Sequence, residues 1–214
     1  IQVSVLDLCE KYADTIMMGR THNIQALPIT FGYKAAIWAD ELERCIARLD
    51  ESRERICALQ LSGAVGSMVS FGEDCPAIQK KMAATLGLSV PNISWHASRD
   101  RLAEFTGELS LIGGCLGRIA QEVYLLMGTE FGEVSEPYAK GIVGSSTMPH
   151  KINPTSSQHM MSCARDLRYH NAAVQEMMWV DHERNIMHSV GEMEHVEAAC
   201  MAAAELLDRA DRLL

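Results

Sequence analysis

Apolar side chains recur every three or four residues along most of the chain, a spacing that places them on one face of an α-helix. This pattern predicts helices over about residues 3–17, 30–59, 76–86, 98–132, 155–179 and 191–214. Two of these helices exceed about 25 residues, which is long for a compact domain and typical of a helical bundle. No segment shows a convincing strand pattern. We therefore predict an all-α fold, an elongated bundle of long helices, forming one central helical-bundle domain over residues 1–214.

The two longest predicted helices carry features that concern packing. Asp40 with Arg44 and Glu51 with Arg55 are acid-first pairs four residues apart, which suits the solvent-facing side of a helix. On the second long helix, Gly117 lies four residues after another glycine. Each helical glycine costs roughly 1 kcal/mol against alanine, so we expect a neighbouring helix to approach closely there.

Three polar, glycine-containing segments interrupt the helical pattern. They are GRTHNIQALP (residues 19–28), LSGAVGSMVSFG (61–72) and GIVGSSTMPHKINP (141–154). The first is either a helix-to-helix turn or a site, because a turn alone does not require Arg20, Thr21 and His22 together. The second offers backbone N–H groups that could bind a carboxylate, although a simple turn explains it as well.

The third segment contains GSSTMPHKINP (144–154), which is either a linker or a loop that carries chemistry. Lys151 and Asn153 are both donors, and they follow two serine hydroxyls. Such a combination can close over an anion, and a serine beside positive charge can be activated as a base or a nucleophile. The segment contains no G-x-S-x-G motif, so hydrolase chemistry is not favoured.

Composition restricts the partners. Hydrophobic residues make up 48% of the 214 residues, charged residues make up 22%, and the formal net charge is −9. These values describe a globular chain and argue against a nucleic-acid surface, which would be basic. An anionic small substrate stays possible, because a local cluster of Arg and Lys can override the overall sign. We find no apolar run long enough to cross a bilayer and expect no membrane association.

The seven cysteines are scattered and form no C-x-x-C pair. This pattern predicts reduced thiols in a cytoplasmic protein without a signal peptide. His182, His188 and His195 match no zinc spacing, so we predict no metal and no cofactor. The chain begins at Ile1 and ends at Leu214 inside helical patterns, and we therefore expect a central piece that lacks flanking domains.

GSSTMPHKINP resembles the long and specific GSSxMPxKxNP signature of the fumarase/aspartase superfamily. GRTHNIQALP resembles the first region of this superfamily and LSGAVGS its second, and all three occur in the expected order. The resemblance covers essentially the whole chain. It implies the central all-helical domain of these proteins, which packs into a shared bundle in a homotetramer whose active sites are each built by three subunits.

The resemblance also implies a reaction, which is anti β-elimination or its reverse addition through a carbanion held as an aci-carboxylate. Clustered hydrogen-bond donors are what such a carbanion needs. By resemblance, Ser145 is the base and His22 is the acid or proton relay. Substrate binding falls to Arg20, Thr21, Ser67, Lys151, Asn153 and Arg184. The implied substrate is a small dicarboxylate or tricarboxylate, and closure of the loop over it would exclude water.

The branch within the superfamily is indicated by the middle of the chain. WH before RDR (residues 95–101) and EFGEVSEP (130–137) look most like the 3-carboxy-cis,cis-muconate cycloisomerase branch. HERNIMHS (182–189) occurs in similar form in that branch and in adenylosuccinate lyase. We therefore predict a cycloisomerase-like, lactonizing enzyme. A fumarate-releasing C–N lyase such as adenylosuccinate lyase is the alternative.

Several positions depart from the patterns of these relatives. Adenylosuccinate lyases usually have histidine, glutamine and arginine where this chain has Gln25, Trp95 and Met193. Many members have a glutamate that orients the catalytic histidine, and this chain has Gln158 there. Without that carboxylate, an imidazolium at His22 would be stabilised less well. In the other direction, cycloisomerases often carry tryptophan where this chain has His22.

A function of another class stays open as well. The same fold serves as crystallin, a structural protein, after loss of activity. The presence of Ser145, Lys151, Asn153 and His22 favours an enzyme over a catalytically silent protein.

Overall fold

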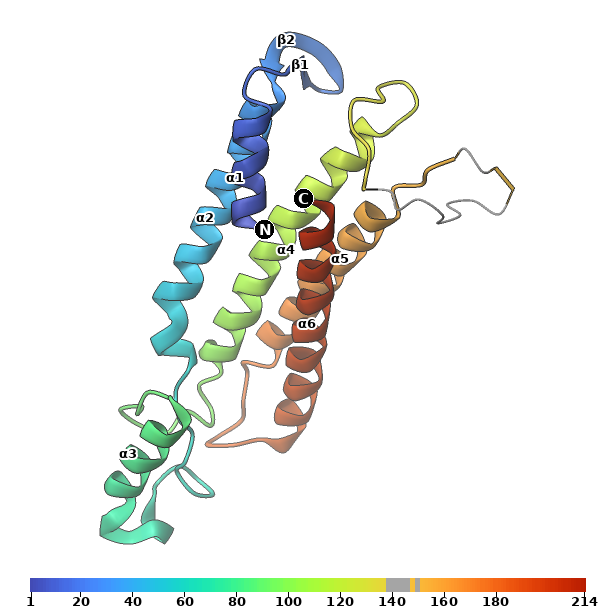
Figure 1. The fold of residues 1–214 in the computed structure, drawn as a ribbon. Coiled ribbons are helices and arrows are strands. Elements are labelled where there is room, and N and C mark those ends of the chain that lie inside the picture. The colour runs from blue at the N-terminus through green and yellow to red at the C-terminus, as the bar shows by residue number, and fades with distance from the viewer. Residues whose placement is uncertain (138–146, 149–150) are drawn as a thin grey trace. The chain divides into compact units, whose positions relative to one another are not determined.

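The computed structural model describes residues 1–137, 147–148 and 151–214. Its elements are α1 (Gln2–Lys11), β1 (Ile16–Thr21), β2 (Ile24–Thr30), α2 (Phe31–Ile56), the 3-10 helix η1 (Val69–Asp74), α3 (Cys75–Leu86), α4 (Asp100–Leu126), α5 (Thr155–Glu176) and α6 (Ile186–Leu213). Long helices dominate (Figure 1), and the predicted all-α class is confirmed. Within the described part of the chain, the strands β1 and β2 form the one sheet.

Helix boundaries follow the predicted periodicity closely in the middle of the chain. α2 begins directly after Thr30, whose Oγ1 accepts a hydrogen bond of 3.1 Å from the backbone N–H of Tyr33 and so caps the helix. α3 ends before Gly87, which adopts a left-handed conformation with φ 68°. α1 ends at Lys11, several residues before its predicted end, because the strand β1 already begins at Ile16.

The chain divides into two compact units. The first comprises residues 1–46, 111–165 and 202–214, and the second comprises residues 47–110 and 166–201. The helices α2, α4, α5 and α6 contribute residues to both units. The hydrogen bonds and ion pairs of the candidate sites each lie within one unit.

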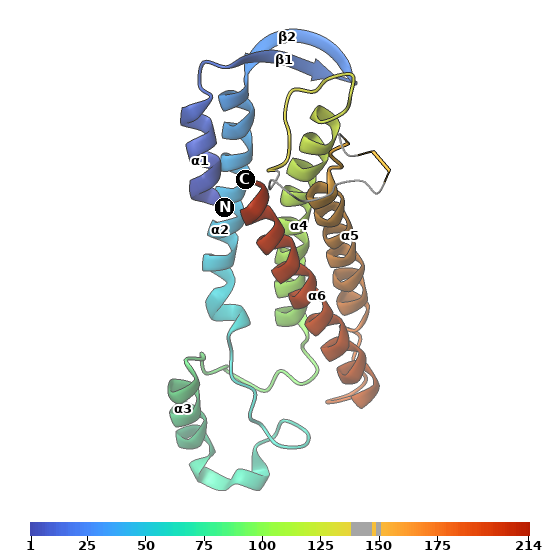
Figure 2. The same ribbon diagram turned by 45° about the vertical axis from the view of Figure 1, so that its right-hand side comes forward.

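In the first unit, α1 lies along the beginning of α2 (Figures 1 and 2). The two backbones approach closely at Gly32, where a Cβ atom would lie 2.6 Å from the carbonyl oxygen of Cys9. The rings of Tyr12, Phe31 and Trp38 pack edge to face, with centroids 5.3 Å and 5.9 Å apart. Trp38 is almost completely buried. This aromatic stack therefore joins α1 to the core beside α2.

Two ion pairs join α2 to α4 in the first unit. Lys34 Nζ lies 2.5 Å from Glu122 Oε1, and Arg118 Nε donates to Glu41 Oε2 at 3.0 Å. The predicted pair of Asp40 with Arg44 is confirmed. Such exposed or half-exposed pairs add little stability individually, about 0–1 kcal/mol, and the packing beneath them carries more.

That packing depends on small side chains where α4 meets α5. A Cβ atom on Gly117 would lie 2.8 Å from the Cβ of Ala164. The close approach that the glycine spacing predicted is thus confirmed at Gly117. Leu116, Ile119 and Met160, which are close in sequence to Gly117 or Ala164, are fully buried. The contact therefore belongs to the core of the unit.

The segment GRTHNIQALP forms a β-hairpin, and our prediction that the chain has no strands was wrong there. β1 and β2 pair in antiparallel fashion, and His22 and Asn23 form a two-residue turn with φ 52° and 62°. Positive φ at both central residues is the geometry of a type I′ hairpin turn. The pairing register shifts at Gly19, where a Cβ atom would lie 2.8 Å from the Leu27 carbonyl oxygen.

The hairpin escaped the sequence pattern because neither strand alternates between buried and exposed positions. Five of the seven residues of β2 are exposed, including Ile24 and Leu27. A strand that buries neither face gives no period of two in hydrophobicity. Figure 2 shows the hairpin at the end of α1 and α2, reaching toward the loop that follows α4.

In the second unit, α2 and α4 are joined by polar contacts. The buried Ser52 hydroxyl donates to the Glu108 carboxylate at 2.9 Å. Arg55 binds the Glu104 carboxylate, with Nε 3.1 Å from Oε1. Its hydrogen bond to Glu51 goes to the backbone carbonyl and not to the carboxylate. The pairing of Arg55 with the Glu51 side chain, which spacing along one helix predicted, is therefore replaced by a pairing between helices.

The connections of the second unit are held by side chains that bind backbone carbonyls. Trp95 Nε1 donates to the carbonyl oxygen of Leu59 at 2.9 Å. Gln79 Nε2 donates to that of Leu61 at 2.6 Å. These bonds satisfy backbone acceptors in a segment without regular structure and fix its path.

By length and composition α4 is able to cross a membrane, with a mean hydropathy of 1.2 and 39% of its most apolar window buried. The expectation that no apolar run reaches this length was therefore wrong. The core helix of a soluble protein meets the same criteria. In this chain, Arg118 and Glu122 on α4 form ion pairs with residues of α2. No other helix in the described ranges meets these criteria.

All seven cysteines lie in the described part of the chain, and none is in a disulfide. Burial, reinforced by the nearby Glu41 and Cys45, raises the pKa of the Cys115 thiol to about 12. This thiol therefore stays protonated at neutral pH and packs as a small apolar side chain.

Candidate active site

The predicted acid lies at the tip of the β-hairpin. Arg20 and Thr21 end β1, and His22 is the first residue of the turn. Thr21 and His22 are exposed. His22 and Asn23 both adopt the left-handed backbone conformation that a two-residue turn of this type requires. The hairpin therefore presents Thr21 and His22 to solvent at its tip.

Arg20 is bound within the protein. Its Nη1 and Nη2 atoms donate to the two carboxylate oxygens of Glu133 at 2.9 Å and 2.6 Å, and Nη1 also reaches the Met18 carbonyl at 3.3 Å. The guanidinium carbon lies 4.5 Å from the centre of the Phe131 ring. Two parallel bonds to one carboxylate are the strong form of this pair, and they hold the hairpin against the loop after α4.

This pair changes the titration of both groups. The hydrogen bond from Arg20 lowers the pKa of the Glu133 carboxyl, and the bond to Glu133 raises the pKa of Arg20. The side chains of Arg20 and Glu133 are 14% and 26% exposed. The ionised pair is thus favoured at neutral pH in a partly buried setting.

Glu136 caps the beginning of α5. Its carboxylate accepts hydrogen bonds from the backbone N–H of Ser156 at 3.1 Å and of Ser157 at 2.7 Å, and from the Ser157 hydroxyl at 2.7 Å. Glu136 is only 7% exposed. The positive end of the helix dipole and three donors stabilise this buried charge.

The predicted base, Ser145, lies outside the described residues. Lys151 is exposed and Asn153 is half-buried, both just before α5 begins at Thr155. The backbone N–H of Lys151 donates to the Met148 carbonyl at 3.0 Å. The anion-binding residues predicted from GSSTMPHKINP therefore lie directly ahead of the helix that Glu136 caps.

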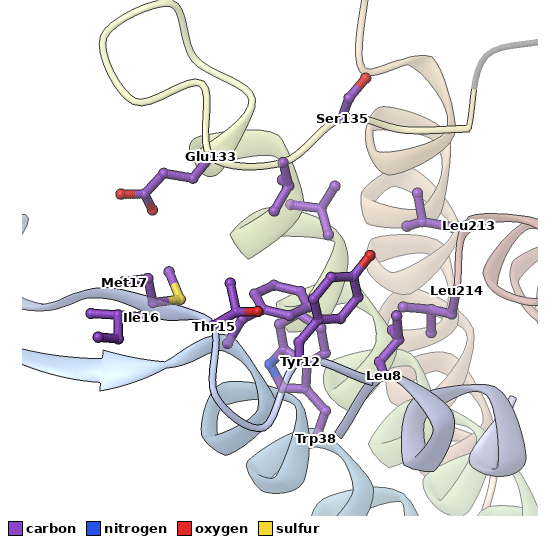
Figure 3. Close-up of a pocket in the computed structure, with 13 residues that line it drawn as sticks. Leu8, Tyr12, Thr15, Ile16, Met17, Trp38, Glu133, Ser135, Leu213 and Leu214 are labelled. Atoms are coloured by element: carbon purple, nitrogen blue, oxygen red, sulfur yellow. The ribbon is translucent and has the colours of Figure 1, made fainter. Parts of the chain in front are cut away.

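A mainly apolar pocket of about 460 Å³ lies in the first unit. Figure 3 shows Ile16 and Met17 on one side of it and Leu213 and Leu214 on the other. None of the predicted site residues within the described ranges lines it. Glu133 is among its lining residues, so the pocket borders the Arg20 pair without containing the predicted chemistry.

A second pocket, of about 370 Å³, lies in the second unit and is lined by two of the segments that sequence analysis singled out. The SGAVGS segment contributes Ala64 and Val65, and HERNIMHS contributes His182, Glu183, Arg184 and Ile186. Arg184 is exposed, and Ser67 lies nearby in sequence and is exposed too. Gly63 and Gly66 adopt positive φ, 78° and 80°, which turns the chain so that backbone N–H groups can face an anion.

His96 is a residue of this unit that sequence analysis did not assign to a site. Its Nδ1 atom is buried and has no hydrogen-bond partner in the described part of the chain. Burial lowers the pKa of His96, and the positive charges of Arg184 and Arg99 lower it further. Arg99 is itself bound to the buried Glu192, with Nε 2.8 Å from Oε1.

Among the described residues, no three His, Cys, Asp or Glu side chains are grouped so as to hold a metal ion. His195 instead lies beside His170, with their Nδ1 atoms 3.2 Å apart. The polar groups of the candidate site are the exposed Lys151 side chain, the Glu136 carboxylate that caps α5 and the exposed His22 imidazole. Such groups can bind carboxylates and move protons.

A sequence model of a family described as lyase matches residues 2–168. The chain belongs to this lyase family, in the fumarase/aspartase superfamily. The chain is 44% identical over 187 residues to N-acetyl-S-(2-succino)cysteine lyase of Dickeya dadantii, covering 87% of this chain and 41% of that protein. It is 40% identical over 208 residues to 3-carboxy-cis,cis-muconate cycloisomerase of Pseudomonas aeruginosa, covering 97% of this chain and 45% of that protein.

The fold of the chain is that of solved relatives. It superposes on the 3-carboxy-cis,cis-muconate lactonizing enzyme of Pseudomonas putida with a TM-score of 0.92 and 34% identity, covering 99% of this chain and 46% of that one. The chain spans less than half the length of the curated relatives it matches.

Sequence reasoning missed Glu133 and Glu136 as residues of the candidate site. Both belong to EFGEVSEP, which was used only to indicate the branch. The signal available was a pair of carboxylates three residues apart directly before the signature loop. Neither their partners nor their burial follows from that spacing, because both partners are distant in sequence.

Proposed function

We propose that the protein of which this chain is part catalyses β-elimination next to a carboxylate. Ser145 removes the proton, and Lys151 with Asn153 binds the carboxylate on which the negative charge develops. His22 supplies a proton to the leaving group or relays one. Membership of the lyase family and the complete GSSTMPHKINP signature support this proposal.

We further propose that the substrate is an S-(2-succino) thioether. The base takes a proton from the carbon next to one carboxylate, the C–S bond of the neighbouring carbon breaks, and fumarate and a thiol are formed. The observation that carries this choice is the identity of 44% to a lyase named for such a substrate, against 40% for the cycloisomerase.

The position of Gln158 agrees with a thiolate leaving group. It lies on α5 and is exposed, and it stands where many members have the glutamate that supports the catalytic histidine. A thiol has a pKa of about 8.5, so a thiolate leaves with less help from an acid than an amine does. C–S cleavage therefore needs less stabilisation of an imidazolium at His22 than cleavage of a C–N bond does.

The test uses the full-length protein and N-acetyl-S-(2-succino)cysteine. Fumarate is followed by its ultraviolet absorbance and the released thiol by a disulfide reagent, and both are expected in equal amounts. If the protein turned over a carboxymuconate and released no thiol from the thioether, the choice of substrate would be overturned. No turnover of any carboxylate substrate would favour the catalytically silent, crystallin-like alternative.

A second candidate is the lactonizing reaction of the cycloisomerases. WH before RDR, EFGEVSEP and the TM-score of 0.92 to a lactonizing enzyme favour it. Adenylosuccinate is a weaker candidate, since Met193 stands where adenylosuccinate lyases place an arginine. A tight dissociation constant for adenylosuccinate would contradict this ranking.

We also propose that the protein is a cytoplasmic homotetramer with shared active sites and without a cofactor. Large apolar side chains are exposed on several helices, which supports burial against other copies. They include Ile37, Ile46, Leu111, Leu125, Met187, Val190, Met201 and Leu207.

A further inference from the structure

Two histidines face each other from the helices α5 and α6, and neither belongs to the proposed active site. The Nδ1 atoms of His170 and His195 lie 3.2 Å apart, and the two ring planes are tilted by 43°. We propose that these two nitrogens form a binding site for one divalent transition-metal ion. Both residues lie within the second unit, so the site requires no contact between the units.

The separation of the two Nδ1 atoms suits a shared ion. A metal such as zinc binds imidazole nitrogen at about 2.0–2.1 Å, which places two such ligands about 3.3–3.4 Å apart in tetrahedral geometry. At a right angle, the same bonds place them about 2.8–3.0 Å apart. The observed 3.2 Å lies between these values. Because the χ2 torsion of histidine is broad, small rotations can turn both lone pairs toward one ion.

Without an ion, a single proton lies between the two rings. One Nδ1 atom carries this proton and donates it to the Nδ1 atom of the other ring. When an ion binds both nitrogens, the donor ring releases the proton from Nδ1 to solvent and takes one up on Nε2. Two neutral rings therefore stay neutral, and the site gains only the charge of the ion.

The groups beside the pair do not compete for it. His170 and His195 are both half-buried, so water can reach an ion held between them. Glu192 precedes His195 by one helical turn, and its carboxylate is bound to Arg99. The amide oxygen of Asn171 accepts hydrogen bonds from two other side chains. The two imidazoles are thus the ligands that the site offers.

These ligands select the class of metal. Imidazole nitrogen suits Zn²⁺, Ni²⁺ and Cu²⁺, whereas Mg²⁺ and Ca²⁺ prefer oxygen ligands. Among the described residues, no third His, Cys, Asp or Glu side chain completes a group, so water fills the other positions. Half of the binding free energy of a four-ligand zinc site corresponds to a dissociation constant of roughly 1–200 µM. The ion should therefore exchange readily.

An ion at this site would stabilise the pairing of α5 with α6, because it binds both nitrogens only in the folded chain. α5 ends at Glu176 and α6 begins at Ile186, and the segment between them contains Arg184. The ion takes no part in the proposed elimination. Spacing along the sequence did not indicate the site, since the two histidines are 25 residues apart and lie on different helices.

The test is a calorimetric titration of the full-length protein with Ni²⁺. All proteins carry Cys200→Ser, because Cys200 is an exposed thiol on the same helix as His195 and could bind the metal itself. This parent should bind one Ni²⁺ per chain in the stated range and should not bind Mg²⁺. His170→Gln and His195→Gln should each weaken binding by at least about 10-fold. The double variant should lose no more than either single variant, as one shared site requires.

The matched control is His159→Gln, on the same helix as His170. His159 is exposed, and its Nδ1 atom lies 2.8 Å from the carbonyl oxygen of Thr155. Its substitution should leave the affinity for Ni²⁺ unchanged. Stability gives a second measurement. Free Ni²⁺ at about 100 times the dissociation constant should raise the folding equilibrium constant about 100-fold in the parent and the control, and much less in either glutamine variant of the pair.

If a glutamine variant does not fold, electron paramagnetic resonance of the parent with Cu²⁺ decides. Two imidazole nitrogens on one ion give a splitting pattern that a single nitrogen does not give. Absence of Ni²⁺ binding by the parent, or a spectrum with a single nitrogen, would overturn the proposal. An affinity that is unchanged in both glutamine variants would overturn it too, because the ion would then be adventitious and bound elsewhere.

Discussion

His96 illustrates what a single residue adds to the account. Its Nδ1 atom is buried without a described partner, and the charges of Arg184 and Arg99 lie close enough to oppose its protonation. In the unfolded chain this cost disappears. The charged form of His96 is therefore favoured in the unfolded protein, and the neutral form in the folded one.

This difference makes stability depend on pH. Because the folded pKa of His96 lies below its ordinary value of 6.5, the unfolded state binds more protons between the folded pKa and 6.5. His96 therefore carries no penalty above that window, and its penalty grows as pH falls through it. In urea unfolding between about pH 7 and pH 5, His96→Gln should lose stability less steeply than wild type. Equal slopes would contradict the assignment.

The Arg20–Glu133 pair predicts a second pH effect, in a lower range. The hydrogen bond from Arg20 lowers the folded pKa of Glu133 from its ordinary value of 4.5. The stability that the pair contributes is complete above 4.5 and is lost as pH falls from there through the folded pKa. Because both side chains are partly exposed, we expect Glu133→Gln to cost about 1 kcal/mol at neutral pH. The difference between wild type and variant should shrink in acid; a constant difference would argue against the ion pair.

At the scale of elements, Gly117 and Gly114 provide a matched pair on α4. Alanine at Gly114 meets nothing within 4 Å, whereas alanine at Gly117 would lie 2.8 Å from the Ala164 Cβ. Gly114→Ala should gain up to about 1 kcal/mol from helix propensity. Gly117→Ala should lose about 1–3 kcal/mol through overpacking. Thermal unfolding of both variants measures this, and a stabilised Gly117→Ala would contradict the close contact of α4 with α5.

The elements also explain which parts of the fold the sequence could predict. The long helices α2 and α4 follow from their apolar periodicity, and α3 follows from its proline start and glycine stop. The hairpin did not, since β2 buries neither face and so shows no alternation. Arg55 pairs with Glu104 on α4 and not with the side chain of Glu51 on its own helix. Only the packing of α2 against α4 decides between these partners.

The same limit applies to the candidate site. Residue types in GRTH and GSSTMPHKINP indicated proton transfer beside a carboxylate, and the superfamily resemblance is confirmed. Glu133 and Glu136 bind Arg20 and Ser157, which lie 113 and 21 residues away. Local pattern cannot supply contacts at such separations.

At the scale of the whole molecule, shared active sites predict complementation between inactive variants. If Ser145 and His22 of one site come from different copies, some sites in a mixed tetramer contain neither substitution. Ser145→Ala and His22→Asn, each inactive alone, should therefore regain part of the wild-type rate when they are unfolded and refolded together. Activity that stays at the level of the separate variants would contradict shared sites between these two residues.

The most direct test of the central claim is the turnover of an S-(2-succino) thioether by full-length Ser145→Ala. Ser145 is proposed to remove the proton that begins the elimination, so fumarate release should fall by at least about 100-fold while the protein stays folded. Substrate binding, measured separately by calorimetry, should change little, since Lys151 and Asn153 remain. A variant that releases fumarate at the wild-type rate would show that Ser145 is not the base and would contradict the account.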